Sequence, residues 1–128
     1  MEGVAGSISW IAVLLGAVAA FLIGWLWYSP VLFGRQWADG VGVEMGSASE
    51  MPVGAMLSQL FGLLLLSWFV GAMASAGALT TLVIGTLGFA VLAFSGGMFR
   101  RNAAPARLTD FGYLVVSVII MAVVQMLL

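Results

Sequence analysis

Four long apolar stretches follow one another along the chain, separated by shorter segments that hold most of the polar and charged residues. A bilayer core about 30 Å thick requires about 20 helical residues at about 1.5 Å each, and every stretch reaches this length. The pattern therefore predicts an all-α, four-transmembrane-helix bundle that forms a single membrane domain over residues 1–128. The predicted spans cover residues 8–28, 53–73, 79–99 and 108–128.

The connections between the spans differ in character. Residues 29–52 and 100–107 form the two connections on one side, and residues 74–78 form a tight turn on the other. Pro30 ends the first span because proline lacks a backbone donor. Residues 31–39 mix apolar, aromatic and charged side chains, which favours a short interfacial segment, such as an amphipathic helix along the headgroups. Thr109 or Asp110 is the predicted cap of the fourth span, with Asp110 paired to Arg107 one turn away.

Basic residues are distributed unequally between the two sides of the predicted membrane domain. Arg35 lies in the first long connection, and the other three arginines, Arg100, Arg101 and Arg107, lie in the second. The opposite side, with both termini and the tight turn, carries no arginine or lysine. Because cytoplasmic loops carry the excess of basic residues, we expect both arginine connections to be cytoplasmic and both termini to be outside.

Composition narrows the class of protein further. The chain is 63% hydrophobic and 7% charged, with a mean hydropathy of +1.20, whereas a soluble domain carries about 25% charged residues. A net charge of -1 with no basic cluster argues against nucleic-acid binding. The chain has no cysteine and no histidine, so the commonest nucleophile and general base are missing, and we expect a protein that is not an enzyme and needs no cofactor or metal.

Two segments carry a family resemblance. The first span ends in Gly24-Trp25-Leu26-Trp27-Tyr28-Ser29-Pro30-Val31-Leu32-Phe33-Gly34-Arg35-Gln36-Trp37. The later segments are Phe99-Arg100-Arg101 and Asp110-Phe111-Gly112-Tyr113-Leu114-Val115. Together they resemble the opening W-Y-S-P-x-x-F-G signature and the closing motif of the bacterial family called domain of unknown function 1761. The resemblance covers most of the chain. It implies a small polytopic membrane protein and no particular activity.

Small residues recur every four positions on the first two spans, which places them on one face of each helix. They are Ala12, Gly16, Ala20 and Gly24 on the first span, and Gly54, Ser58 and Gly62 on the second. Such faces let helices approach closely. Two interpretations remain open: packing within one protomer, and self-association as a homo-oligomer.

A second candidate feature lies on the arginine-rich side. Tyr28, Ser29 and Arg35, joined by Arg100, Arg101 and Arg107, are candidates for a site that binds a lipid headgroup or another anion. The simpler interpretation is that the W-Y-S-P-x-x-F-G motif ends a helix at the interface and that the arginines only orient the protein.

Two glutamines are the candidate polar residues within the membrane. Gln59 and Gln125 lie near opposite ends of their spans, so they cannot pair within one protomer. We expect each to bond a neighbouring backbone or its own copy across an interface.

These patterns favour a non-enzymatic structural or accessory protein of a prokaryotic plasma membrane. Its expected partners are membrane lipid, in particular anionic lipid, and further copies of itself or the subunits of a larger membrane complex. The alternative is an oligomeric channel or facilitative transporter for a small solute or ion.

Overall fold

The computed structural model describes residues 8–43 and 53–128, and this part of the chain consists of helices joined by turns, without a strand. Its helices are α2 (Trp10–Trp27), α3 (Gly34–Val41), α4 (Val53–Ser75), α5 (Leu79–Phe99) and α6 (Ala104–Leu127). Four of them, α2, α4, α5 and α6, are long and apolar enough to cross a bilayer. The predicted all-α fold with four candidate spans is confirmed. Residues 44–52 of the predicted connection 29–52 lie outside the described residues.

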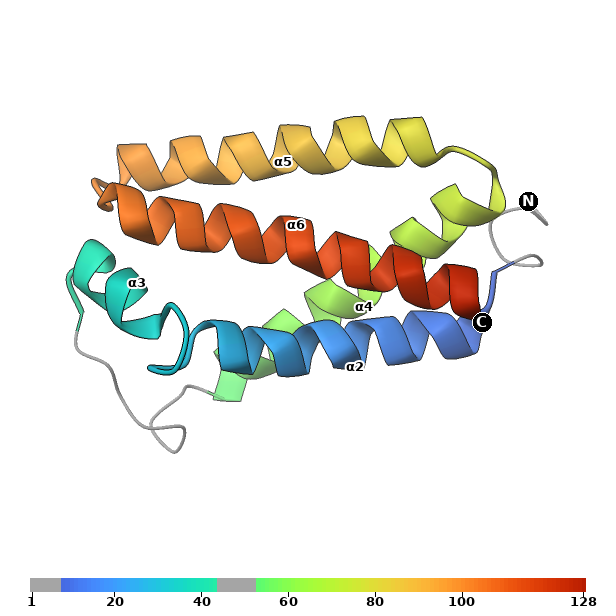
Figure 1. Cartoon of the computed structure of the whole chain (residues 1–128), viewed down its shortest axis with the longest axis horizontal. Coiled ribbons are helices and arrows are strands. Elements are labelled where there is room, and N and C mark those ends of the chain that lie inside the picture. Colours follow the sequence, from blue (N-terminus) through green and yellow to red (C-terminus); the bar gives the residue numbers. More distant parts are fainter. Residues whose placement is uncertain (1–7, 44–52) are drawn as a thin grey trace.

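The four long helices form a bundle in which α6 is central (Figure 1). Helix α6 packs against α2, α5 and α4, and α2 also packs extensively against α4. Helix α4 crosses the others obliquely, so it diverges from α5 despite the short turn that joins them. The beginning of α2 and the C-terminus lie at one end of the bundle, whereas α3 and the α5–α6 turn lie at the other. We call this second end the α3 end.

Local sequence explains where α2 ends and α3 begins. Ser9 caps α2, its hydroxyl accepting a hydrogen bond from the Ala12 backbone N–H at 3.3 Å. After Trp27 the chain turns through Ser29 and Pro30, and the backbone N–H of Gly34 bonds the Ser29 carbonyl at 2.9 Å. Helix α3 then runs for 8 residues and stops at Gly42, whose φ of 88° suits glycine. The predicted interfacial segment is therefore a short helix.

Helix α6 begins at Ala104, earlier than the predicted start at residue 108. Pro105 occupies its first turn, where the missing backbone N–H has no cost. Arg107, Thr109 and Asp110 are consequently inside the helix, and the prediction that Thr109 or Asp110 caps it is wrong. The hydroxyl of Thr109 instead donates to the Pro105 carbonyl at 2.7 Å.

The centre of the bundle is built from small and aliphatic side chains. Its buried cluster combines residues of all four long helices: Ala17, Ala20, Leu63, Val70, Leu82, Val118 and Met121. Large apolar side chains such as Ile11, Phe61 and Phe89 are more than 60% exposed, as expected for faces that contact lipid.

Candidate functional site

Two sequence segments far apart in the chain meet at the α3 end. The Tyr28 hydroxyl donates to Asp110 Oδ1 at 2.6 Å, across a separation of 82 residues. Its neighbour Trp27 donates from Nε1 to the backbone carbonyl of Thr109 at 2.9 Å. The end of α2 is therefore joined to the first turns of α6 by two hydrogen bonds from consecutive aromatic residues.

Aromatic contacts extend this junction to α3. The Tyr28 ring packs edge-on against both Trp37 and Tyr113, with ring centroids 5.6 and 5.5 Å apart. Trp27 packs against Phe33 with centroids 4.7 Å apart. These contacts fold the chain after α2 back against the bundle.

Glycines make the close approach possible at three positions. A Cβ at Gly24 would lie 2.5 Å from the Tyr113 hydroxyl, which donates to the Ala20 carbonyl at 2.7 Å. A Cβ at Gly112 would lie 3.0 Å from the Trp27 ring. At the far end of α3, a Cβ at Gly40 would lie 2.7 Å from the Cβ of Ala106. All three glycines therefore leave room for one specific neighbour.

The Tyr28 hydroxyl is held as a hydrogen-bond donor. Burial, followed by the hydrogen bond to the Asp110 carboxylate, raises the pKa of Tyr28 above its ordinary value of 10.0. Tyr28 therefore stays neutral at physiological pH. The predicted pairing of Asp110 with Arg107 is wrong, because Arg107 Nε donates to the Asn102 carbonyl at 3.1 Å and its guanidinium lies over the Phe94 ring at 4.8 Å.

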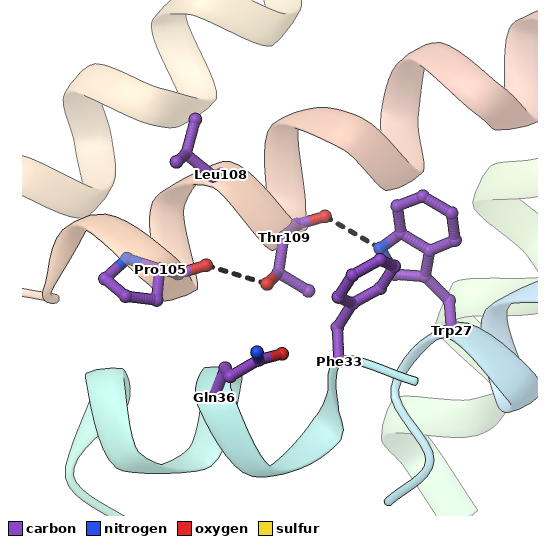
Figure 2. A pocket seen from close by; sticks show the side chains of 6 residues that line it. All are labelled: Trp27, Phe33, Gln36, Pro105, Leu108 and Thr109. Atoms are coloured by element: carbon purple, nitrogen blue, oxygen red, sulfur yellow. Dashed lines mark hydrogen bonds between the residues drawn. The ribbon is translucent and has the colours of Figure 1, made fainter. Parts of the chain in front are cut away.

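A pocket of about 210 Å³ lies beside this junction, between α3 and the start of α6. Its lining residues are Trp27, Phe33, Gln36, Pro105, Leu108 and Thr109. Figure 2 shows the Gln36 side chain reaching from α3 towards Thr109, with the Trp27 and Phe33 rings closing one side. The pocket is smaller than the roughly 300–1,000 Å³ of sites that enclose a whole small molecule.

The predicted headgroup site is only partly assembled. The hydroxyls of Tyr28 and Ser29 are occupied, because Ser29 Oγ donates to the Leu26 carbonyl at 2.7 Å. Arg35 on α3 and Arg100 and Arg101 on the α5–α6 turn are exposed at the same end of the bundle. In the described part of the chain, no ion pair joins these three arginines to a carboxylate.

The small-residue face of α2 is turned inward. Ala12 and Ala20 are fully buried, and a Cβ at Gly16 would lie 3.0 Å from Ser67 Oγ. This face is therefore used for packing within the protomer. The corresponding residues of α4, Gly54, Ser58 and Gly62, are exposed, and a Cβ at either glycine would have no neighbour within 4 Å.

Among the polar residues within the membrane, some are also bonded inside the protomer and one is exposed. Gln125 Nε2 donates to the Ser9 carbonyl at 3.3 Å, in space left by Gly71. Ser67 donates to the Val13 carbonyl of α2 at 2.8 Å. Gln59 is exposed on α4, on the side that approaches the Tyr113 hydroxyl.

Comparison with known families decides the classification. Residues 11–126 match the model of the family described as "Protein of unknown function (DUF1761)". The chain belongs to this family. No curated protein and no solved structure is detectably similar to it. The DUF1761 assignment agrees with a membrane protein and carries no activity.

Sequence reasoning missed the pairing of the two DUF1761-like segments. Tyr28 belongs to the opening segment and Asp110 to the closing segment. The sequence pattern grouped Tyr28 with Ser29 and Arg35 and paired Asp110 with Arg107, and it did not indicate that the two residues contact each other. A usable signal was present, because both segments flank span ends that must lie on the same side of the membrane. Among the described residues no cluster of three His, Cys, Asp or Glu side chains could hold a metal ion.

Proposed function

We propose that this DUF1761 protein is a non-enzymatic, homo-oligomeric component of the prokaryotic plasma membrane that binds anionic lipid at its cytoplasmic end. The observation that supports lipid binding is the exposure of Arg35, Arg100 and Arg101 at the α3 end, without carboxylate partners among the described residues. These arginines lie beside the ends of the spans, at the level of lipid headgroups. Basic residues there attract anionic lipid with about 1 kcal/mol each.

The open face of α4 supports self-association. Gly54, Ser58 and Gly62 lie one turn apart on this face, and the two glycines have no neighbour within 4 Å. In a bilayer, small residues let helices approach closely enough to gain van der Waals contact and backbone hydrogen bonds. The small-residue face of α2 already packs inside the protomer. The small-residue face of α4 therefore remains available for contact with a second copy.

A channel receives less support from the geometry. On α6, the polar side chains Ser117 and Gln125 turn towards the interior of the protomer, where Ser117 is 1% exposed and Gln125 binds the backbone of α2. A water-filled path between protomers would need a continuous polar stripe on the outer faces of the bundle. Ser58 and Gln59 are exposed on α4, but Ser117 and Gln125 of α6 do not extend such a stripe.

Native mass spectrometry of the gently extracted protein tests both parts of the proposal. We expect a homo-oligomer that retains phosphatidylglycerol in preference to phosphatidylcholine. Replacing Arg100 and Arg101 by Gln should reduce that preference several-fold, and Gly62→Leu should shift the oligomer towards monomer. A protein that is monomeric and retains both lipids equally would refute the proposal.

A further inference from the structure

The pocket between α3 and α6 lies at the depth where a phospholipid changes from headgroup to acyl chain. Trp27 is the last residue of α2, and Pro105 lies in the first turn of α6. Both helices are long enough to cross the bilayer, so these two residues mark the end of the apolar region. Molecules that reach this depth from the membrane are lipids.

The walls of the pocket suit an apolar chain with one polar group. The indole N–H of Trp27 is bonded to the Thr109 carbonyl and the Thr109 hydroxyl to the Pro105 carbonyl, as the dashed lines in Figure 2 show. Both side-chain donors are therefore paired within the protein, and the Trp27 and Phe33 rings supply apolar surface. The Gln36 amide reaches in from α3, and it is the one side-chain hydrogen-bond donor of the lining that is unpaired among the described residues.

Charge and size select the kind of lipid. Arg35 is exposed next to Gln36 on α3, and within the described residues Asp39, four positions further on, forms no ion pair with it. None of the lining residues is charged, and Arg35 is the basic residue next to the pocket-lining Gln36 in the chain. A volume of about 210 Å³ exceeds the ~150 Å³ that admits a benzene ring but cannot enclose a whole lipid. The occupant must therefore insert only a segment.

We infer that this pocket holds the ester end of one acyl chain of an anionic phospholipid. The Gln36 amide donates to the ester carbonyl, Arg35 contacts the phosphate, and the first methylenes of the chain lie against Trp27 and Phe33. This inference rests on the proposed binding of anionic lipid and assigns it a site.

Filling the pocket tests the assignment. Gln36→Trp adds a ring from the α3 side, and Thr109→Leu adds bulk from the α6 side without any change in charge. Val31→Trp is the matched control, because Val31 is 78% exposed and does not line the pocket. Native mass spectrometry would count phosphatidylglycerol retained per protomer, and circular dichroism would confirm that each variant is folded.

We expect the wild type and Val31→Trp to retain one tightly held phosphatidylglycerol per protomer. Either filling variant should lower its retention at least tenfold. Arg35→Gln should lower the preference over phosphatidylcholine several-fold while chain insertion persists.

The possible failures are distinguishable. If both folded filling variants retain the lipid like the wild type, while replacing Arg100 and Arg101 weakens retention, the pocket assignment is wrong and lipid binding stands. If the wild type itself shows no preference for phosphatidylglycerol, both the site and the lipid-binding proposal fail.

Discussion

At the scale of single residues, Tyr28 is the side chain on which the α3 end depends most. Its hydroxyl binds Asp110, and its ring contacts Trp37 and Tyr113, so it connects α2, α3 and α6. A hydrogen bond to a charged acceptor contributes about 1.5–3 kcal/mol, more than a neutral one. Tyr28 therefore has a structural role in addition to ending the first span.

Tyr28→Phe should lower the free energy of unfolding by about 1–3 kcal/mol, because the Asp110 carboxylate loses its partner while the ring is kept. Denaturant unfolding in detergent micelles, followed by circular dichroism, measures the change. Ser29→Ala is the control, since its hydroxyl bonds only a carbonyl three residues away. Equal effects of the two substitutions would contradict this role.

The raised pKa of Tyr28 predicts a dependence on alkaline pH. Folding favours the neutral hydroxyl, so its contribution to stability is complete below the unfolded tyrosine pKa of about 10 and is lost as the pH rises above it. The chain has two tyrosines, so the difference in ultraviolet absorbance titration between the wild type and Tyr28→Phe isolates this group. We expect that difference to develop well above pH 10. Titration near 10 in the folded protein would show that the hydroxyl is solvated.

Gly24→Ala and Gly85→Ala should have different consequences for stability although both are glycines within apolar helices. A methyl group at Gly24 meets the Tyr113 hydroxyl at 2.5 Å, so overpacking should cost about 1–3 kcal/mol. A methyl group at Gly85 meets nothing within 4 Å. Thermal unfolding at a fixed detergent concentration should show a decrease for the first and none for the second. A similar decrease for both would mean that the α2–α6 contact is not tight.

At the scale of elements, α3 is held against α6 mainly because the two backbones lie close together at Gly40. The Ala103 N–H donates to the Gly40 carbonyl at 2.8 Å, and Gly40 faces Ala106, which is 0% exposed. Because so short a helix is marginal by itself in water, its position depends on this contact and on the aromatic junction.

Gly40→Leu should separate α3 from α6, since the new side chain would occupy the position of Ala106. Hydrogen exchange followed by mass spectrometry should then show at least tenfold faster exchange in residues 34–41, with the four long helices unchanged. Asp39→Leu is the matched control, because Asp39 is exposed on the same helix. Unchanged protection in Gly40→Leu would show that the aromatic contacts alone hold α3.

At the scale of the whole molecule, we expect the orientation in the membrane to depend on the arginines. The structure places the C-terminus and the beginning of α2 at the end opposite the α3 end, so a single preference orients the entire bundle (Figure 1). The positive-inside rule predicts that the α3 end faces the cytoplasm.

Replacing Arg35, Arg100 and Arg101 by Glu should weaken or invert this orientation. A C-terminal reporter that is active only outside the cytoplasm measures it, and we expect high activity in the wild type and a marked loss in the variant. Arg107→Gln is a useful comparison, because Arg107 packs on Phe94 and its loss should act on stability more than on orientation. A triple variant with unchanged reporter activity would contradict the topology argument.

The sequence by itself determined the four spans and their shared side, because crossing a bilayer depends on the length and apolarity of each segment, and both are local properties. The residues at which α3 and α6 begin and end were harder to predict from the sequence. For α6, the reason is that Pro105 is compatible both with a loop and with a first helical turn. Only the tertiary structure decided how each helix is rotated. Gly16 and Gly62 stand in similar small-residue patterns, yet one is buried against Ser67 and Met121 and the other has no neighbour. The Tyr28–Asp110 bond and the pocket beside it likewise arise from the packing of α2, α3 and α6, which no single segment encodes.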